Sequence, residues 1–138
     1  MAQMQWHPSL ETGVELLDAQ HRRLVDLVNR LDAALSGGNI DREMGRVLAD
    51  LVVYSHEHFA AEEDLMQRIG FYGLHNHRTE HRRIAQQIKG FLLRLKQGGN
   101  VSPTELLIFL QSWIGNHIAK EDAKIGKAAA TRRTAAVG

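Results

Sequence analysis

The sequence predicts an all-α fold, an up-down-up-down antiparallel four-helix bundle with an extended N-terminal arm. Along four long segments, apolar residues recur at alternating steps of three and four, as on the inward face of a bundled helix. The loops between these segments are short and contain glycine, and the only two prolines, Pro8 and Pro103, lie outside the periodic stretches. No segment shows a competing strand pattern.

The composition indicates one domain and limits the kinds of site it can carry. A chain of 138 residues, 43% of them hydrophobic, can bury a core. Its formal net charge of +1 gives no reason to expect a nucleic acid or a membrane surface as partner. The chain has no cysteine, so any metal must be held by nitrogen and oxygen. No signal-like segment or bilayer-spanning run is found, and a cytoplasmic location is expected.

The helices can be placed from their apolar seams and their end signals. Residues 1–12 have no sustained period and are expected to form the arm. The inward seams run from His21 to Leu35, from Met44 to Ile69, from His77 to Leu95 and from Leu106 to His117. Asp41 is a candidate cap for the second helix, and Ser102-Pro103-Thr104-Glu105 combines the start signals of the fourth. We expect the bundle to occupy residues 1–125 and residues 126–138 to form a frayed or disordered tail.

Histidines gather on the inward seams. Five of the eight lie there, with at least one from each helix: His21, His58, His77, His81 and His117. One histidine on an apolar face is more often an ordinary core residue than a ligand, but five in one interior are hard to explain unless something binds them. Antiparallel packing allows all five to meet near one end of the bundle.

Two carboxylates can accompany these histidines. Glu62 follows His58 by about one helical turn, and a charge on an inward seam is costly unless a cation or a metal pairs with it. Asp122 follows His117 by five residues, which overshoots the helical stripe by about 140°. Asp122 can therefore join only if the helix loosens near its end, and spacing alone leaves it open between a ligand and a solvated helix end. Three flanking acids are expected on a solvated face: Glu57, Glu63 and Asp64.

The number of donors indicates two metal ions rather than one. Seven ligands are too many for a single ion, but they suit two if both carboxylates bridge. Together with one bridging oxide or hydroxide, these ligands occupy all but one of the coordination positions of two six-coordinate ions. Nitrogen and oxygen donors with octahedral preference favour iron first and manganese next, whereas zinc usually takes four ligands.

The order and spacing of these residues resemble those of the hemerythrin family in its bacterial single-domain form. The resemblance runs from Trp6 to about Asp122, through His21, His58-Phe59-x-x-Glu62-Glu63, His77-x-x-x-His81 and Trp113-x-x-x-His117-Ile118-x-x-x-Asp122. It implies a non-haem di-iron centre that binds dioxygen reversibly, with two iron ions joined by a bridging oxo or hydroxo group. It further implies one iron on His77, His81 and His117, the other on His21 and His58, and bridges from Glu62 and Asp122.

The resemblance also implies an apolar oxygen pocket, although the same side chains can simply fill the core. Its expected members are Leu24, Phe59, Trp113, Ile114 and Ile118. Apolar walls of this kind exclude water and protons. One departure is Ile125, where the family often has a tyrosine, and this puts the lifetime of the oxygenated form in question. Tyr54, one turn before His58, is a candidate for a hydroxyl near the centre.

These observations favour an oxygen carrier, store or sensor over an enzyme. The alternative is a di-iron enzyme that acts on peroxide, nitric oxide or oxygen at the same site. A carboxylate-rich di-iron oxidase is disfavoured because its two Glu-x-x-His motifs are absent from the sequence. A metal-free interaction bundle is disfavoured by the five inward histidines. Dioxygen is the expected ligand, and an unidentified protein acceptor or signalling partner stays open.

Overall fold

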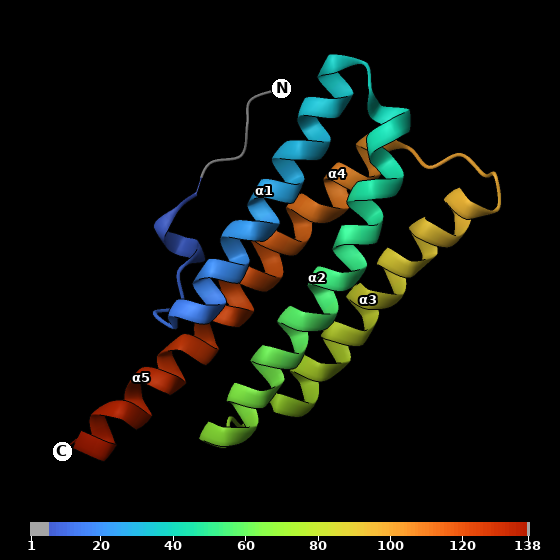
Figure 1. Ribbon diagram of the computed structural model, residues 1–138. Helices are drawn as coiled ribbons and strands as arrows, with labels where there is room; N and C mark the ends of the chain where they lie inside the picture. Colours follow the sequence, from blue (N-terminus) through green and yellow to red (C-terminus); the bar gives the residue numbers. More distant parts are fainter. Residues whose placement is uncertain (1–5, 138) are drawn as a thin grey trace.

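The computed structural model describes residues 6–137 and confirms the four-helix bundle (Figure 1). The first three helices are α1 (Glu15–Gly37), α2 (Ile40–Ile69) and α3 (Leu74–Lys96). The fourth is continuous but changes character, from α4 (Pro103–Ser112) through the π-helical η2 (Trp113–Asp122) to α5 (Ala123–Val137). Helix α2 packs against both α1 and α3, and α1 packs against α4. The described residues contain no strand.

The start of α4 agrees with the capping signal in the sequence, whereas the start of α2 does not. Ser102 caps α4, because its side-chain hydroxyl accepts a hydrogen bond from the backbone N–H of Glu105 at 3.2 Å. The predicted start of the fourth helix is therefore confirmed. Helix α2 begins at Ile40, so Asp41 lies in its first turn and the prediction that Asp41 caps this helix is wrong. A carboxylate in the first turn still interacts favourably with the helix dipole.

The described part of the N-terminal arm, residues 6–12, lies against the bundle next to the start of α1 (Figure 1). A short 3-10 helix, η1 (Pro8–Leu10), interrupts its extended course and contacts η2. Trp6 donates from its indole nitrogen to Glu11 at 3.2 Å, and the guanidinium of Arg22 lies 4.5 Å from the indole centre. These contacts hold the arm beside α1.

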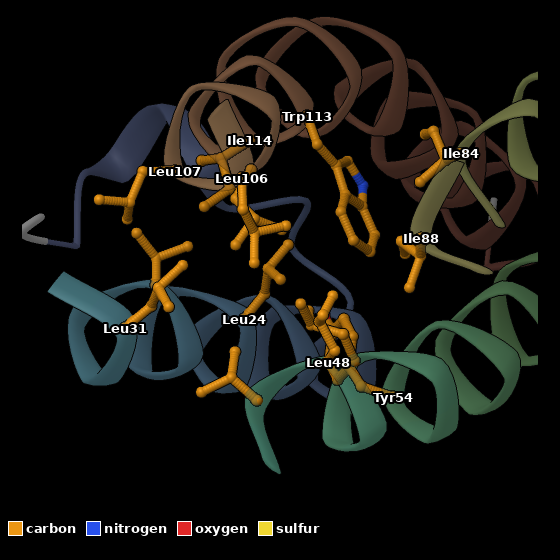
Figure 2. Packing of buried hydrophobic residues seen from close by; sticks show 14 of the residues in the cluster. Leu24, Leu31, Leu48, Tyr54, Ile84, Ile88, Leu106, Leu107, Trp113 and Ile114 are labelled. Atoms are coloured by element: carbon orange, nitrogen blue, oxygen red, sulfur yellow. The ribbon is translucent and has the colours of Figure 1, made fainter. Parts of the chain in front are cut away.

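Two apolar clusters fill the bundle and leave a polar layer between them. The larger contains residues such as Leu24, Leu31, Leu48, Leu106 and Trp113, which converge in the bundle interior (Figure 2). The smaller consists of Leu17, Met66, Phe71 and Ile125. In α1 the order along the chain is Leu17, His21, Leu24, so the inward histidine lies between the two clusters. The histidine layer is thereby sealed by apolar side chains on both sides.

The C-terminal segment continues the fourth helix of the bundle. Helix α5 extends to Val137, the side chain of Ile125 is fully buried, and Ala129 is 6% exposed. Ile125 belongs to the smaller apolar cluster, and at Gly126 the helix lies close to the backbone of Thr12. Across residues 6–137, no helix combines the length and apolar character that crossing a membrane requires.

Candidate metal centre

The structure brings all seven predicted ligands together in the polar layer. Each is at most 6% exposed, and they come from every helix of the bundle: His21 from α1, His58 and Glu62 from α2, His77 and His81 from α3, and His117 and Asp122 from η2. Their donor atoms form two groups, and within each group all atoms lie within 4.8 Å of one another. One group contains three histidines and the other contains two, and both share Glu62 and Asp122.

The π-helical turn decides the position of Asp122. In a π-helix each backbone N–H bonds to the carbonyl five residues earlier, so side chains five residues apart share a face. Because η2 has this geometry from Trp113 to Asp122, His117 and Asp122 both point into the bundle. The loosening that the spacing requires is therefore present. The side chain of Asp122 is fully buried, which excludes the solvated helix end.

Glu62 reaches both histidine groups with different oxygen atoms. Its Oε2 lies 3.4 Å from Nε2 of His58 and 3.7 Å from Nε2 of His21. Its Oε1 lies 2.9 Å from Nε2 of His81 and 3.4 Å from Nε2 of His77. Each oxygen of this carboxylate thus faces one group.

Asp122 is divided between the groups in the same way. Its Oδ2 lies 3.1 Å from Nε2 of His21 and 3.9 Å from Nε2 of His58. Its Oδ1 lies 3.0 Å from Nε2 of His77 and 3.2 Å from Nε2 of His117. Both carboxylates therefore span two positions, one beside two histidines and one beside three.

Several of these donor atoms are buried without a hydrogen-bond partner. They are Nε2 of His58, His77 and His117, Oε2 of Glu62 and Oδ1 of Asp122. Leaving such atoms unsatisfied typically costs about 1–3 kcal/mol each. A concentration of buried nitrogen and oxygen atoms without hydrogen-bond partners in one layer fits bound cations, and such donors suit iron or manganese.

Without metal, the charges of the centre stabilise one another. Burial lowers the pKa of His21, but contacts with Asp122 and Glu62 outweigh burial and raise it to about 10. The pKa of His77 responds to the same opposing effects and rises to about 9. Burial raises the pKa of Glu62, but the charge of His58 and contacts with neighbouring histidines hold it well below its usual value. Divalent cations would replace the histidine protons, so metal uptake would release protons.

Three of the five histidine rings are oriented by acceptors outside the centre. Each ring contacts an oxygen through Nδ1: His21 the carbonyl of Leu10 at 3.2 Å, His58 the side chain of Gln20 at 2.7 Å, and His81 the carboxylate of Glu63 at 2.9 Å. With Nδ1–H donated outward, the Nε2 lone pair points into the centre. Such contacts fix the tautomer and orientation of metal-binding histidines.

The expectation that Glu63 lies on a solvated face is wrong. Its side chain is only 27% exposed, and besides His81 it accepts a hydrogen bond from Arg78 at 3.1 Å. Glu62 points into the layer, and the next residue of α2 is turned toward α3, where His81 and Arg78 lie. An acidic residue next to a metal ligand in the sequence is only a weak indication of a contact with the centre, because the sequence does not show which helix its side chain faces.

Gln20 and Tyr54 act together behind His58. The hydroxyl of Tyr54 donates to the backbone carbonyl of Gln20 at 2.6 Å, and the Tyr54 ring stacks on His58 with centroids 5.4 Å apart. This hydroxyl therefore supports the residue that orients His58. Apolar periodicity did not predict a role for Gln20, because this residue lies beside the inward face of α1 rather than on it.

The predicted pocket residues all belong to the larger apolar cluster. Leu24, Phe59, Trp113, Ile114 and Ile118 are at most 6% exposed. Phe59 stacks on His81 with centroids 3.9 Å apart, and the Trp113 ring lies 5.5 Å from the Phe59 ring. Phe59 thus lies between the His81 ring and Trp113, and Trp113 belongs to the same apolar cluster as Tyr54, Ile88 and Leu106 (Figure 2).

Comparison with known proteins agrees with this arrangement. Residues 12–129 match the model of the hemerythrin HHE cation binding domain. The chain belongs to the hemerythrin family. Among its relatives are bacteriohemerythrins from Pseudomonas aeruginosa, 33% identical over 89% of this chain and 79% of that protein, and from Campylobacter jejuni, 31% identical over 82% and 85%. The crystal structure of a wild-type hemerythrin superposes with a TM-score of 0.82 at 30% identity, covering 92% of this chain and 98% of that one.

Proposed function

We propose that this hemerythrin-family protein binds dioxygen reversibly at a non-haem di-iron centre. The observation that carries the proposal is the asymmetry of the donor set, with two carboxylates shared between a group of three histidines and a group of two. His77, His81 and His117 would hold one ion, and His21 and His58 the other. The two-histidine position has one ligand fewer, and this leaves room for a small exogenous ligand.

The surroundings of the centre support a binding role. Held by these histidines and carboxylates, a pair of ferrous ions would supply the two electrons needed for reversible binding of dioxygen. With two carboxylates and one hydroxide, two ferrous ions give the layer a net charge of only +1, which a buried interior can tolerate. Apolar side chains such as Leu24, Phe59 and Ile118 exclude water and so slow competing proton transfer.

Metal analysis combined with an oxygen titration tests this function. We expect two irons per chain and a visible charge-transfer spectrum that appears with oxygen and disappears when oxygen is removed. His58→Ala should abolish the reversible spectrum, while His56→Ala, an exposed histidine two residues away, should retain it. Purified protein with one zinc or no metal would contradict the proposal.

The same titration distinguishes a carrier from an enzyme. A spectrum that formed once, failed to reverse and accompanied catalytic consumption of peroxide would replace oxygen binding by a di-iron enzyme. Catalytic consumption of nitric oxide would likewise indicate a di-iron enzyme. A bound state that survives repeated oxygenation cycles without consuming substrate supports the carrier, store or sensor.

A further inference from the structure

The loop that enters α1 is held by a single buried carboxylate. Oδ1 of Asp18 accepts hydrogen bonds from the backbone N–H of Thr12 at 2.7 Å and from its hydroxyl at 2.8 Å. Oδ2 accepts from the backbone N–H of Gly13 at 3.2 Å. Asp18 is 9% exposed, so these hydrogen bonds are largely shielded from water. Such charge-assisted hydrogen bonds are stronger than neutral ones, and together they fix the loop on α1.

The opposite side of this loop lies directly on α5. A Cβ placed on Gly126 would lie 2.0 Å from the carbonyl oxygen of Thr12, a distance that no side chain can occupy. Thr12 is therefore enclosed between Asp18 of α1 and the bare backbone of Gly126. Only a glycine at this position of α5 allows the loop to approach so closely.

The loop connects directly to one of the proposed metal ligands. Two residues before Thr12, the carbonyl of Leu10 faces Nδ1 of His21 at 3.2 Å. Leu10 is buried, and its own N–H donates to the carbonyl of His7 at 2.9 Å, so the carbonyl belongs to a compact turn. The position of the Leu10 carbonyl depends on the residues that follow it, Thr12 and Gly13. Asp18 holds these residues from one side, and Gly126 lies against Thr12 on the other.

We propose that Asp18 is a positioning residue of the metal centre. It does not touch the metal ligands; it fixes Thr12 and Gly13, so that the Leu10 carbonyl holds the His21 ring with Nε2 toward Glu62 and Asp122. The ion held by His21 and His58 depends on this arrangement, whereas the ion on the three-histidine side does not. The inference rests on the proposed di-metal function and assigns a role to a residue outside the centre.

Titration with Co²⁺ tests the asymmetry of this effect. The three-histidine position should fill first because it offers one more nitrogen, and the second ion should enter beside His21 and His58. Contacts that orient ligands typically contribute about 10–100-fold to metal affinity. We therefore expect Asp18→Asn to weaken binding of the second ion by about that factor and to leave the first unchanged. Asp26→Asn, at an exposed position of the same helix, is the matched control.

A second variant disturbs the loop from the α5 side. Gly126→Ala should displace Thr12 and weaken the same second ion, even though Gly126 shares no hydrogen bond with Asp18. Gly90→Ala is its control, because a Cβ on Gly90 would meet nothing within 4 Å. Thr12→Val removes the hydroxyl and its contacts with Asp18 and the Val14 N–H, but it keeps the backbone N–H hydrogen bonds to Asp18 and should produce a smaller loss than Asp18→Asn. Equal weakening of both ions in Asp18→Asn would indicate a general structural defect and overturn the proposal.

Hydrogen exchange separates failure of this inference from failure of the proposed function. In metal-free protein, the amides of Thr12 and Gly13 should exchange faster in Asp18→Asn than in the wild type. Faster exchange with an unchanged second Co²⁺ affinity would show that the loop does not position His21. A wild type that binds fewer than two ions would refute the di-metal function itself, and the dependent role of Asp18 with it.

Discussion

The metal-free protein should lose stability as the pH rises from about 6.5 to about 9. The pKa of His21 rises from 6.5 to about 10 on folding, because Asp122 and Glu62 outweigh its burial. A histidine whose pKa is raised by folding contributes its full stabilisation below the unfolded value and loses it as the pH approaches the folded value. The pKa of His77, raised to about 9, has the same sign.

The expected size follows from the linkage between protonation and folding. At roughly 1.4 kcal/mol for each pKa unit, protonated His21 contributes about 5 kcal/mol at low pH. About 3 kcal/mol of this is lost between pH 6.5 and pH 9. His77 adds to this loss of stability, but by less than it would if it titrated alone, because it shares both carboxylates with His21. The depressed pKa of Glu62 has no effect in this window, since its contribution is lost only in acid.

Urea unfolding in the presence of a chelator, followed by far-ultraviolet circular dichroism, measures this loss. His21→Gln should reduce the pH dependence, and the double variant His21→Gln with His77→Gln should remove most of it. His75→Gln, at an exposed position of α3, should retain it. A wild-type free energy of unfolding that stays constant or increases over this range would refute the proposed ionisation of the centre. Bound metal should suppress the dependence, because the ions replace the protons.

Three substitutions test individual contacts of the centre. Glu62→Ala removes a bridge and should reduce the metal content from two ions toward one, while Asp64→Ala, on the exposed face of α2, should leave it unchanged, as metal analysis would show. Glu63→Gln should weaken the ion on the three-histidine side by about 10-fold or more, measured by metal titration, since it removes the carboxylate that orients His81. Tyr54→Phe should lower the free energy of unfolding by about 1 kcal/mol without changing the metal content, because only one hydrogen bond is lost.

The sequence by itself determined the helices and which residues face inward. Apolar periodicity predicted the inward faces of the four helices, and the local signal at Ser102 predicted the start of the fourth, because these features depend on neighbours a few residues away. The same periodicity placed five histidines and Glu62 in the interior. Their ligand spacing, through its resemblance to hemerythrins, indicated a shared centre before their distances were known.

Only the tertiary structure decided how the side chains meet. Asp122 faces the centre because η2 is π-helical. The five-residue spacing from His117 showed that the helix would have to loosen, but it could not show that the helix does so. Glu63 was expected in solvent and contacts His81, and Asp18 reaches the centre only through the backbone of the arm. These contacts join residues from different segments. Helical periodicity reports which side of a helix is buried but not which atom of another segment lies opposite it.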